Sequence, residues 1–383
     1  MSGIYVHIPF CVKRCSYCNF FSSTDLSLRE AYVEALCREM DLRCDYLSNE
    51  PADTLYIGGG TPSILSVALI EKIISHAKNI FKLTPNAEIT LEANPNNLTN
   101  DYMKQLSDTV INRLSIGIQS FFDDNLVVLG RVHTGKQAET SLELAHKYHF
   151  TNLSADLMYA YPHLSEDQWR KNLEKVKNLN HLSCYGLSLE PHSKLYKQIQ
   201  GKIYSLPDEE ETIRQYQLLR DFARTNNFIH YETSNFCKSG QFSRHNTACW
   251  QNEIYAGIGT AAHSFNRLQR QWNIANVNDY IRQINALKTP KQWKEQGKNV
   301  LFNCEILTTT MRVNEYIMTS LRTVWGCDLQ YVKEQFGLSF YVDLVDRLNA
   351  INPQWYILEN NKLILTSQGS LLADAIAGDL FFD

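Results

Sequence analysis

Short β-type runs alternate with helical stretches over the first half of this 383-residue chain, and this alternation restricts the fold more than any other feature. Branched and apolar residues mark six strand-like runs, at residues 4–8, 54–57, 88–92, 113–118, 152–157 and 182–187. Segments of helical periodicity separate these runs, and Ser27 followed by Glu30 predicts a capping box at the start of the first helix. Strands that alternate with helices form parallel sheets, so the sequence predicts a barrel-type α/β fold.

Residues able to bind or react follow most of these runs. A glycine-rich turn comes directly after the second run, and Glu92, Gln119 and Asp156 lie at or just beyond the ends of the next three. In barrel enzymes the active site is built from the loops at the C-terminal ends of the strands. We therefore expect these side chains to share one site.

Three cysteines in the loop after the first run, Cys11, Cys15 and Cys18, have the spacing CxxxCxxC. A loop this short can direct three thiolates at three irons of one iron–sulfur cluster. One iron then stays open to a further ligand, as the open position of a catalytic zinc does. Lys13 and Arg14 would favour the thiolate forms. A structural zinc site is the alternative, but such sites usually use a second pair of ligands, which this sequence lacks.

The CxxxCxxC motif is the signature of radical S-adenosylmethionine (SAM) proteins. Together with the preceding stretch from Tyr5 to Phe10, it makes the chain resemble two related families over essentially its whole length. These are the oxygen-independent coproporphyrinogen III dehydrogenases and the HemW-type haem chaperones. The resemblance implies a partial (β/α)6 TIM-like barrel that stops at six strands. It also implies a [4Fe–4S] cluster whose open iron binds SAM.

The resemblance assigns further residues to SAM. Gly59, Gly60 and Thr61 match the motif that contacts the SAM amino group, and six other residues match family positions that contact SAM: Tyr5, Tyr17, Glu92, Gln119, Arg131 and Asp156. Simpler explanations remain open: a tight turn for the glycines, a surface carboxylate for Glu92, an ion pair of Arg131 with Asp156, and aromatic packing for the tyrosines. His7 fits a ligand or a core histidine equally well.

A second motif, His245-Asn246-Thr247-Ala248-Cys249-Trp250, resembles the HNxxYW motif of the haem chaperones, in which the histidine is associated with haem binding. A neutral imidazole is an ordinary axial ligand of haem iron, and Trp250 could pack on the macrocycle. Here Cys249 replaces the usual tyrosine. The alternatives are a surface turn with a capping His-Asn pair and, for Cys249, a second haem ligand. His263 matches another region near the site.

Three features favour the haem chaperone over the dehydrogenase. The dehydrogenase motif has a further cysteine two residues after the third ligand, where this chain has Phe20. The dehydrogenase also has an extension before its first strand, whereas three residues precede Ile4 here, and the HNxxYW-like motif is the third feature. The expected function is therefore to bind haem and deliver it to apo-haemoproteins such as respiratory enzymes, with SAM bound but coproporphyrinogen not decarboxylated.

The sequence of the second half of the chain predicts two further structural regions. Residues 1–235 are assigned to the barrel, 236–300 to a linker region that carries the HNxxYW-like motif, and 301–383 to a smaller, mainly helical C-terminal domain. A hairpin between helices makes that domain resemble a winged helix. Residues 329–383 hold three basic residues against seven acidic ones, a balance that repels phosphate. We expect this domain to pack or to dock a partner rather than to bind nucleic acid.

Composition limits the remaining possibilities. The net charge of −4 offers no basic surface for nucleic acid or anionic membrane. No apolar run approaches the roughly 20 residues of a membrane span, and the chain begins without a signal peptide. We expect a cytoplasmic protein with reduced thiols, associated with membranes only through its partners. A homodimer is possible in this family. The seven cysteines outside the CxxxCxxC motif are expected to act as small hydrophobic residues.

Overall fold

The computed structural model describes residues 1–48 and 50–383. Its centre is a sheet in the order β12-β11-β10-β9-β1-β2-β3-β4-β5-β6-β8-β7. Its six middle strands, all parallel, are β1 (Ser2–Ile8), β2 (Thr54–Gly59), β3 (Glu88–Ala93), β4 (Arg113–Gln119), β5 (Leu153–Tyr159) and β6 (His181–Gly186). They coincide with the six runs predicted from the sequence, so the α/β fold with a parallel sheet is confirmed.

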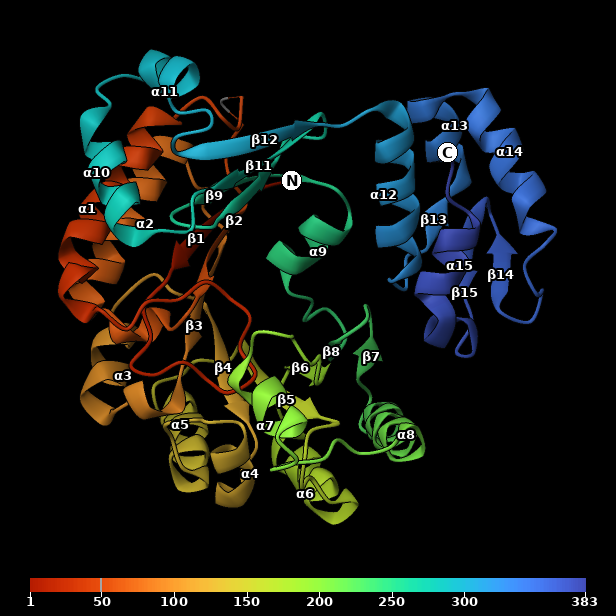
Figure 1. Ribbon diagram of the computed structural model, residues 1–383, viewed down its shortest axis with the longest axis horizontal. Coiled ribbons are helices and arrows are strands. Elements are labelled where there is room, and N and C mark those ends of the chain that lie inside the picture. Colours follow the sequence, from red (N-terminus) through yellow and green to blue (C-terminus); the bar gives the residue numbers. More distant parts are fainter. Residues whose placement is uncertain (49) are drawn as a thin grey trace.

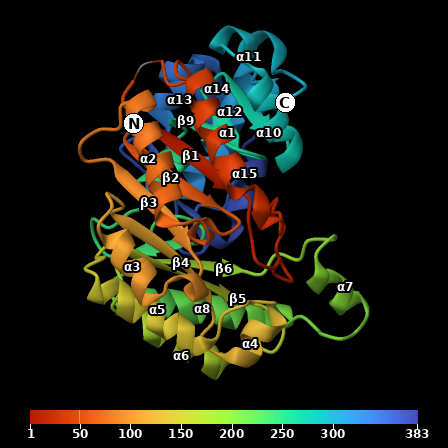
Figure 2. The same ribbon diagram turned by 90° about the vertical axis from the view of Figure 1, so that its left-hand side faces the viewer.

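Helices connect successive strands and form an outer layer around them (Figures 1 and 2). They are α1 (Arg29–Leu42), α2 (Val67–Phe81), α3 (Asn100–Ser107), α4 (Asp123–Val128), α5 (Gly135–Lys147) and α6 (Glu166–Val176). Side chains alternate between the two faces of a strand. On β1 the apolar set Ile4, Val6 and Ile8 is fully buried in the main hydrophobic core, which leaves Tyr5 and His7 on the inner face.

The predicted capping box at the start of α1 is wrong. Leu28 is the N-cap of this helix and makes no side-chain capping bond. A short 3-10 turn, Leu26–Leu28, precedes the helix, and Asp25 caps that turn by accepting a hydrogen bond from the backbone of Ser27. Ser27 is therefore part of the turn and cannot also cap the helix.

Strands from the second half extend the sheet at both ends. β9 (Ile254–Ile258) runs parallel to β1, and three antiparallel strands follow it: β10 (His263–Phe265), β11 (Gln269–Asn273) and β12 (Phe302–Ile306). At the other end β8 (Asn235–Cys237) and β7 (Ile229–His230) continue from β6. The segment 236–300, expected as a linker region, thus contributes strands to this sheet and side chains to its core.

Five helices accompany these later strands: α7 (Lys194–Gln200), α8 (Glu209–Thr225), α9 (Arg244–Trp250), α10 (Val277–Ala286) and α11 (Pro290–Gln296). Among them α9 contacts β1, β2 and β9. Its position matters for function because it carries the HNxxYW-like motif.

The C-terminal residues form a separate unit with its own hydrophobic core, drawn in blue beside the barrel in Figure 1. Its elements are α12 (Thr309–Leu321), β13 (Cys327–Asp328), α13 (Leu329–Phe336), α14 (Leu338–Leu348), β14 (Tyr356–Glu359), β15 (Lys362–Leu365) and α15 (Ala373–Asp379). The strands form a small sheet in the order β13-β15-β14. This is the mainly helical, winged-helix-like unit that was expected; the boundaries 1–235, 236–300 and 301–383 stay a prediction.

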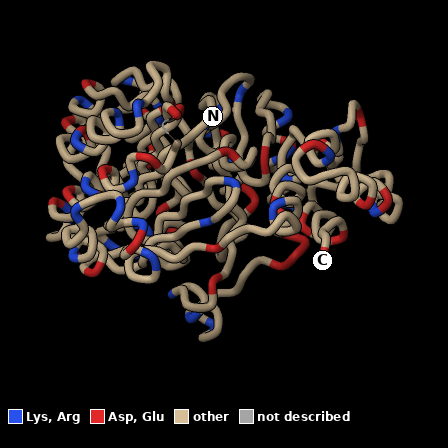
Figure 3. The backbone as a smooth tube through the Cα atoms, turned by 90° about the horizontal axis from the view of Figure 1, so that it is seen from above, with Lys and Arg blue, Asp and Glu red and all other residues tan. Residues whose placement is uncertain are grey.

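The C-terminal unit docks on the last strands of the sheet. The backbone N–H of Val324 donates to the carbonyl of Tyr231 at 3.0 Å, and Glu232 and Thr323 form a β-bridge. Acidic and basic residues are interspersed along both units in the view of Figure 3. No helix in the described part of the chain is both long and apolar enough to cross a membrane.

A buried ion pair fixes the loop after β9. The carboxylate of Glu39 lies 3.0 Å from the guanidinium of Arg43, and both side chains are almost fully buried. Glu39 also accepts hydrogen bonds from the backbone N–H of Gly259 at 2.7 Å and from the hydroxyl of Tyr280 at 2.5 Å. A buried charge is tolerated only when it is paired and hydrogen-bonded. Here these bonds join α1, α10 and the loop.

Candidate cofactor site at the C-terminal ends of the strands

The cysteine loop follows β1 and is tied down at both ends. The backbone N–H of Cys11 donates to the carbonyl of Ser23 at 3.0 Å, and that of Ser16 donates to the carbonyl of Leu129 at 3.0 Å. The hydroxyl of Ser16 adds a bond of 2.7 Å to the carbonyl of Val128. The loop is thereby held while the thiols of Cys11, Cys15 and Cys18 stay half-buried.

The surroundings of the thiols suit a cluster. Burial raises the pKa of Cys11 and of Cys18, whereas the positive charge of Arg131 lowers both. A Cβ at Gly60 would lie 2.9 Å from the Cys11 sulfur, so the glycine keeps the space beside this thiol open. Among the described residues no three His, Cys, Asp or Glu side chains surround a single ion. A cubane cluster does not need that arrangement, because each thiolate binds a different iron.

The glycine-rich turn after β2 lies against the cysteine loop. Gly59 has φ +115, a conformation that L side chains rarely adopt, and a Cβ there would lie 2.7 Å from the His7 ring. The hydroxyl of Thr61 donates to the Cys11 sulfur at 3.5 Å. The turn is thus confirmed: the backbone N–H of Gly59 donates to Glu92 at 2.9 Å and that of Gly60 to the carbonyl of Ile8 at 2.8 Å. Its role as a ligand site stays a prediction.

Two carboxylates lie on strands either side of β4: Glu92 near the end of β3 and Asp156 in the middle of β5. Glu92 accepts hydrogen bonds from the hydroxyl of Tyr56 at 2.8 Å and from the backbone N–H of Gly59 at 2.9 Å. Burial raises the pKa of Glu92 from 4.5 to about 7. Asp156 accepts from the hydroxyl of Ser115 at 3.0 Å, and burial raises its pKa as well. Both acids are thus held in place by bonds from their own neighbourhood.

Arg131 connects the strand ends to the cysteine loop. Its guanidinium donates to the carbonyl of Gly117 at 2.7 Å, to the side chain of Asn94, and to the Cys15 sulfur at 3.4 Å. It also lies 3.5 Å from the hydroxyl of Tyr17. The suggested ion pair between Arg131 and Asp156 is not among its contacts with described residues. Arg131 instead fixes the position of one thiol.

Gln119 closes β4 in a left-handed conformation, with φ 64, at an irregularity in the pairing of β4 with β5. A Cβ on Gly117 would approach the Gln119 amide to 3.2 Å and the Arg131 guanidinium to 3.3 Å. The glycine therefore makes room for both predicted SAM contacts. Because of this irregularity, Gln119 does not follow the regular alternation of side chains between the two faces of β4.

Tyr5 and His7 share the inner face of β1. The hydroxyl of Tyr5 lies 3.0 Å from Nδ1 of His7, and Nε2 of His7 lies 3.2 Å from the carbonyl of Phe21. With the proton on Nε2, both ring nitrogens are satisfied within the protein, and burial lowers the pKa of His7 to about 4. His7 therefore has the contacts of a core histidine, and it orients Tyr5.

His245 lies at the opposite end of the strands from the cysteines. Its Nδ1 is 2.8 Å from the hydroxyl of Thr54, near the start of β2, and its ring stacks on Tyr56 at 5.2 Å and on Tyr5 at 6.4 Å. The backbone N–H groups of Arg244 and His245 donate to the carboxylate of Glu88 at 3.1 and 3.0 Å. Burial lowers the pKa of His245 to about 4, so its ring stays neutral. The surface-turn alternative does not describe this buried side chain.

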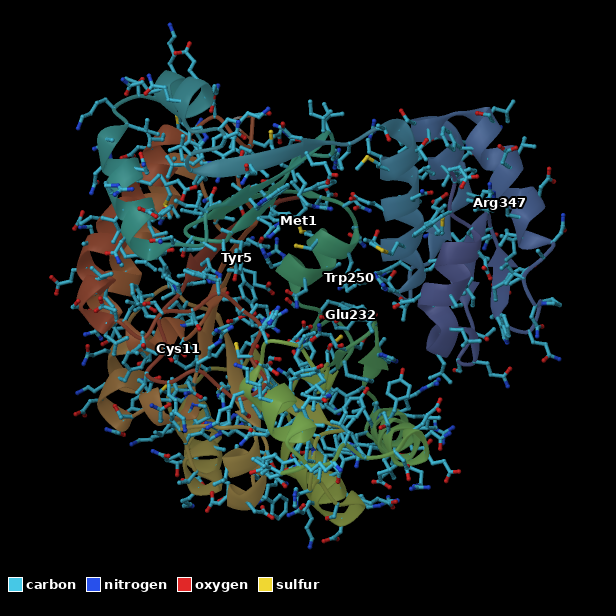
Figure 4. The ribbon with its side chains drawn as sticks, in the orientation of Figure 1. Met1, Tyr5, Cys11, Glu232, Trp250 and Arg347 are labelled. Carbon is cyan, nitrogen blue, oxygen red and sulfur yellow. The ribbon has the colours of Figure 1, made fainter. Side chains whose placement is uncertain are left out.

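The rest of the HNxxYW-like motif faces the junction of the two units. Asn246 and Trp250 line a cavity of about 420 Å³ together with Tyr185, Glu232 and Arg322. Figure 4 shows Tyr5 between Cys11 and Trp250, with Glu232 close to Trp250. Burial raises the pKa of the Cys249 thiol to about 12, which keeps it protonated.

The structure thus divides the predicted residues into two groups. Those at the C-terminal ends of the strands come together: Cys11, Cys15, Cys18, Tyr17, Gly59, Gly60, Thr61, Glu92, Gln119, Arg131 and Asp156. His245 lies at the other end, and Tyr5 is the predicted residue between the two groups. Sequence reasoning missed Tyr56 and Asn94, which hold Glu92 and Arg131. His263 is exposed on β10 and stacks with Trp272 at 6.1 Å.

Comparisons with known proteins identify the family. A model of the Radical SAM superfamily matches residues 5–176. The haem chaperone HemW of Lactococcus lactis is 31% identical over 100% of this chain and 98% of its own length, and that of Bacillus subtilis is 31% identical over 99% and 98%.

Among solved structures, the coproporphyrinogen III oxidase HemN from Escherichia coli, a radical SAM enzyme, has a TM-score of 0.83. It covers 99% of this chain and 90% of its own at 22% identity, a likeness that shows the fold. The full-length matches to HemW proteins at 31% identity show the family as well as the fold. The chain belongs to the HemW family of haem chaperones within the radical SAM superfamily.

Proposed function

We propose that this protein binds a [4Fe–4S] cluster, SAM and haem, and delivers the haem to apo-haemoproteins such as respiratory enzymes. The observation that carries the proposal is the full-length similarity to haem chaperones named HemW. Membership of the radical SAM superfamily implies the cluster and SAM. The haem is suggested by the name of the relatives and by the motif at His245.

The residues at the C-terminal ends of the strands fit the cluster and SAM. Cys11, Cys15 and Cys18 would hold the cluster, which supplies an electron able to cleave a carbon–sulfur bond of SAM. The turn at Gly59, Gly60 and Thr61 offers the amino acid end of SAM a close backbone approach. The two half-buried carboxylates of Glu92 and Asp156 suit its hydroxyl groups and positive charge. Tyr5, Tyr17, Gln119 and Arg131 complete the proposed SAM site.

His245 is proposed as the haem-associated residue. Its ring is neutral, which is the form that ligates iron. Asn246 and Trp250 of the same helix line the cavity at the junction, so α9 connects the inner face of the sheet to that cavity. A haem bound in this cavity would contact the indole of Trp250 and lie beside the helix that carries His245.

The proposed function also implies a location and a set of partners. The protein would work in the cytoplasm, reach membranes only through its acceptors, and have no nucleic-acid partner; a homodimer is a further possibility. The rival function is that of a coproporphyrinogen III dehydrogenase, which uses SAM to convert two propionates to vinyl groups. Phe20, at the position of the extra dehydrogenase cysteine, is 69% exposed, and it offers no thiol there.

An anaerobic haem titration tests the proposal. The protein with a reconstituted cluster is titrated with haem and followed by Soret absorbance, with His245→Ala alongside. His192→Ala serves as the matched control because His192 is exposed. We expect saturable, stoichiometric binding that weakens in His245→Ala and not in the control.

Two other outcomes have different meanings. Saturable binding that His245→Ala leaves unchanged would contradict the role of His245 but keep the haem chaperone. Absence of specific binding would contradict the chaperone itself. Formation of protoporphyrinogen IX from coproporphyrinogen III under anaerobic, reducing conditions would then establish the rival function.

A further inference from the structure

The inner face of the central sheet is polar along its whole height. Barrel interiors are usually filled by branched apolar side chains. Here the inward positions of β2 to β6 carry mostly hydroxyl, charged and imidazole groups: Thr54, Tyr56, Glu88, Thr90, Glu92, Arg113, Ser115, Ser154, Asp156, His181 and Ser183. Many of them are paired with one another or with α9, as the preceding contacts show. This face therefore holds a buried polar network where a barrel usually has an apolar core.

Two adjacent residues on this face are exceptions to the pairing. Thr90 on β3 and Arg113 on β4 are direct cross-strand neighbours. Their exposures are 0% and 1%. The hydroxyl of Thr90 and Nε of Arg113 have no hydrogen-bond partner, and the guanidinium forms no ion pair with any residue that the structure describes.

The other charged side chains in and beside the sheet differ from Arg113. Glu39 pairs with Arg43, Glu88 accepts the N-terminal N–H groups of α9, and Glu92 and Asp156 accept from their own neighbours. The two carboxylates provide negative charge near Arg113, but they accept none of its N–H donors. A planar guanidinium with free donors beside a free hydroxyl matches the two oxygens of a carboxylate.

We propose that Thr90 and Arg113 together receive a carboxylate group of a ligand that binds against the inner face of the sheet. The inference rests on the proposed function, for which the ligand is haem and the group is one of its propionates. The site lies between the two parts already described. Glu92 is two residues beyond Thr90 on β3, toward the cofactor end, and His245 lies within electrostatic range of Arg113 toward the other end.

The proposal assigns different roles to the two ends of the porphyrin. His245 would meet the iron, and Arg113 would fix the orientation of the ring by holding one acidic edge. Truncating one partner of a buried, charge-assisted hydrogen bond usually weakens binding strongly, because the other charge is left unpaired. Loss of an uncharged hydrogen bond has a smaller effect.

The test compares haem with its dimethyl ester, in which both propionates are uncharged. Soret titrations are run on the wild type, Arg113→Gln and Thr90→Val, with Arg170→Gln as the control because Arg170 is exposed on α6. For haem we expect Arg113→Gln to weaken binding at least about tenfold and Thr90→Val about threefold, with the control unchanged. For the dimethyl ester all four proteins should bind equally, and more weakly than the wild type binds haem.

The outcomes separate the inference from the function on which it rests. If the wild type does not bind haem at all, the proposed function fails. If the wild type binds haem and Arg113→Gln binds it equally well, the inference is wrong while the function stands. If Arg113→Gln lost as much affinity for the dimethyl ester as for haem, the inference would also be wrong, because Arg113 would then support the fold rather than bind a propionate. Thermal unfolding of the four apo-proteins identifies that last case directly.

Discussion

Replacing Glu92 with glutamine should stabilise the protein without its cofactors and weaken its binding of SAM. Burial raises the pKa of Glu92 from 4.5 to about 7. Between these pH values the folded protein keeps a proton that the unfolded chain has released. The folded state is therefore stabilised less and less as the pH rises through this window, and the loss levels off above about pH 7.

The magnitude follows from the shift. A rise from 4.5 to about 7 corresponds to roughly 3 kcal/mol lost by pH 8, at about 1.4 kcal/mol per pKa unit. Partial exposure of the residue reduces this, so we expect about 1–3 kcal/mol. Glutamine can keep both hydrogen bonds, since its carbonyl accepts from the Gly59 N–H and its amide donates to a rotated Tyr56 hydroxyl. The variant should thus equal the wild type near pH 5 and exceed its stability at pH 8.

Urea unfolding of the apo-proteins at pH 5, 6, 7 and 8, followed by far-ultraviolet circular dichroism, measures this difference. Glu305→Gln is the control because Glu305 is exposed. A gap between Glu92→Gln and the wild type that does not change with pH would refute the reasoning. So would a variant that is less stable than the wild type at pH 8. An unchanged SAM affinity in Glu92→Gln would refute the role of Glu92 in SAM binding.

Two further predictions concern the loops that shape the site. Glu39→Ala removes the partner of the buried Arg43 and should lower the free energy of unfolding by about 3–5 kcal/mol. A loss under about 1 kcal/mol in urea unfolding would contradict the stabilising role of this ion pair. Gly60→Ala places a Cβ 2.9 Å from the Cys11 sulfur and should lower the iron and sulfide retained after reconstitution by more than half. Gly378→Ala, where an added Cβ meets nothing within 4 Å, should load fully, and equal loading of both variants would disprove the steric argument.

The parallel sheet was predictable because each of its six central strands has a recognisable local sequence pattern. The run 113–118, for example, is rich in apolar residues and lies between two segments of helical periodicity. Assigning it as a strand therefore needs no information about long-range contacts. The positions of Glu92, Gln119 and Asp156 at one edge then follow from the geometry of parallel strands. The strands at the edges of the sheet were not predicted, since β7, β8 and β10 are two or three residues long and carry no periodicity.

Other features depend on contacts that no local pattern contains. The motif at His245 reads as a turn, yet the carboxylate of Glu88 holds the start of α9 against the first strands, which buries the imidazole. Arg131 and Asp156 look like an ion pair, but Arg131 is directed to the cysteine loop by Asn94 and Gly117. The importance of Arg113 was not predicted. Strand alternation shows that Arg113 and Ser115 share one face of β4, but not whether that face is the inner or the outer face of the curved sheet.

The most direct test of the central claim measures haem transfer. The haem-loaded, cluster-reconstituted protein is mixed anaerobically with increasing amounts of an apo-haemoprotein, and the shift of the Soret band is followed in time. The account predicts a transfer rate that rises with the acceptor concentration, because delivery requires contact between the two proteins. A rate that is independent of the acceptor, equal to the passive loss of haem to the solvent, would contradict the chaperone function.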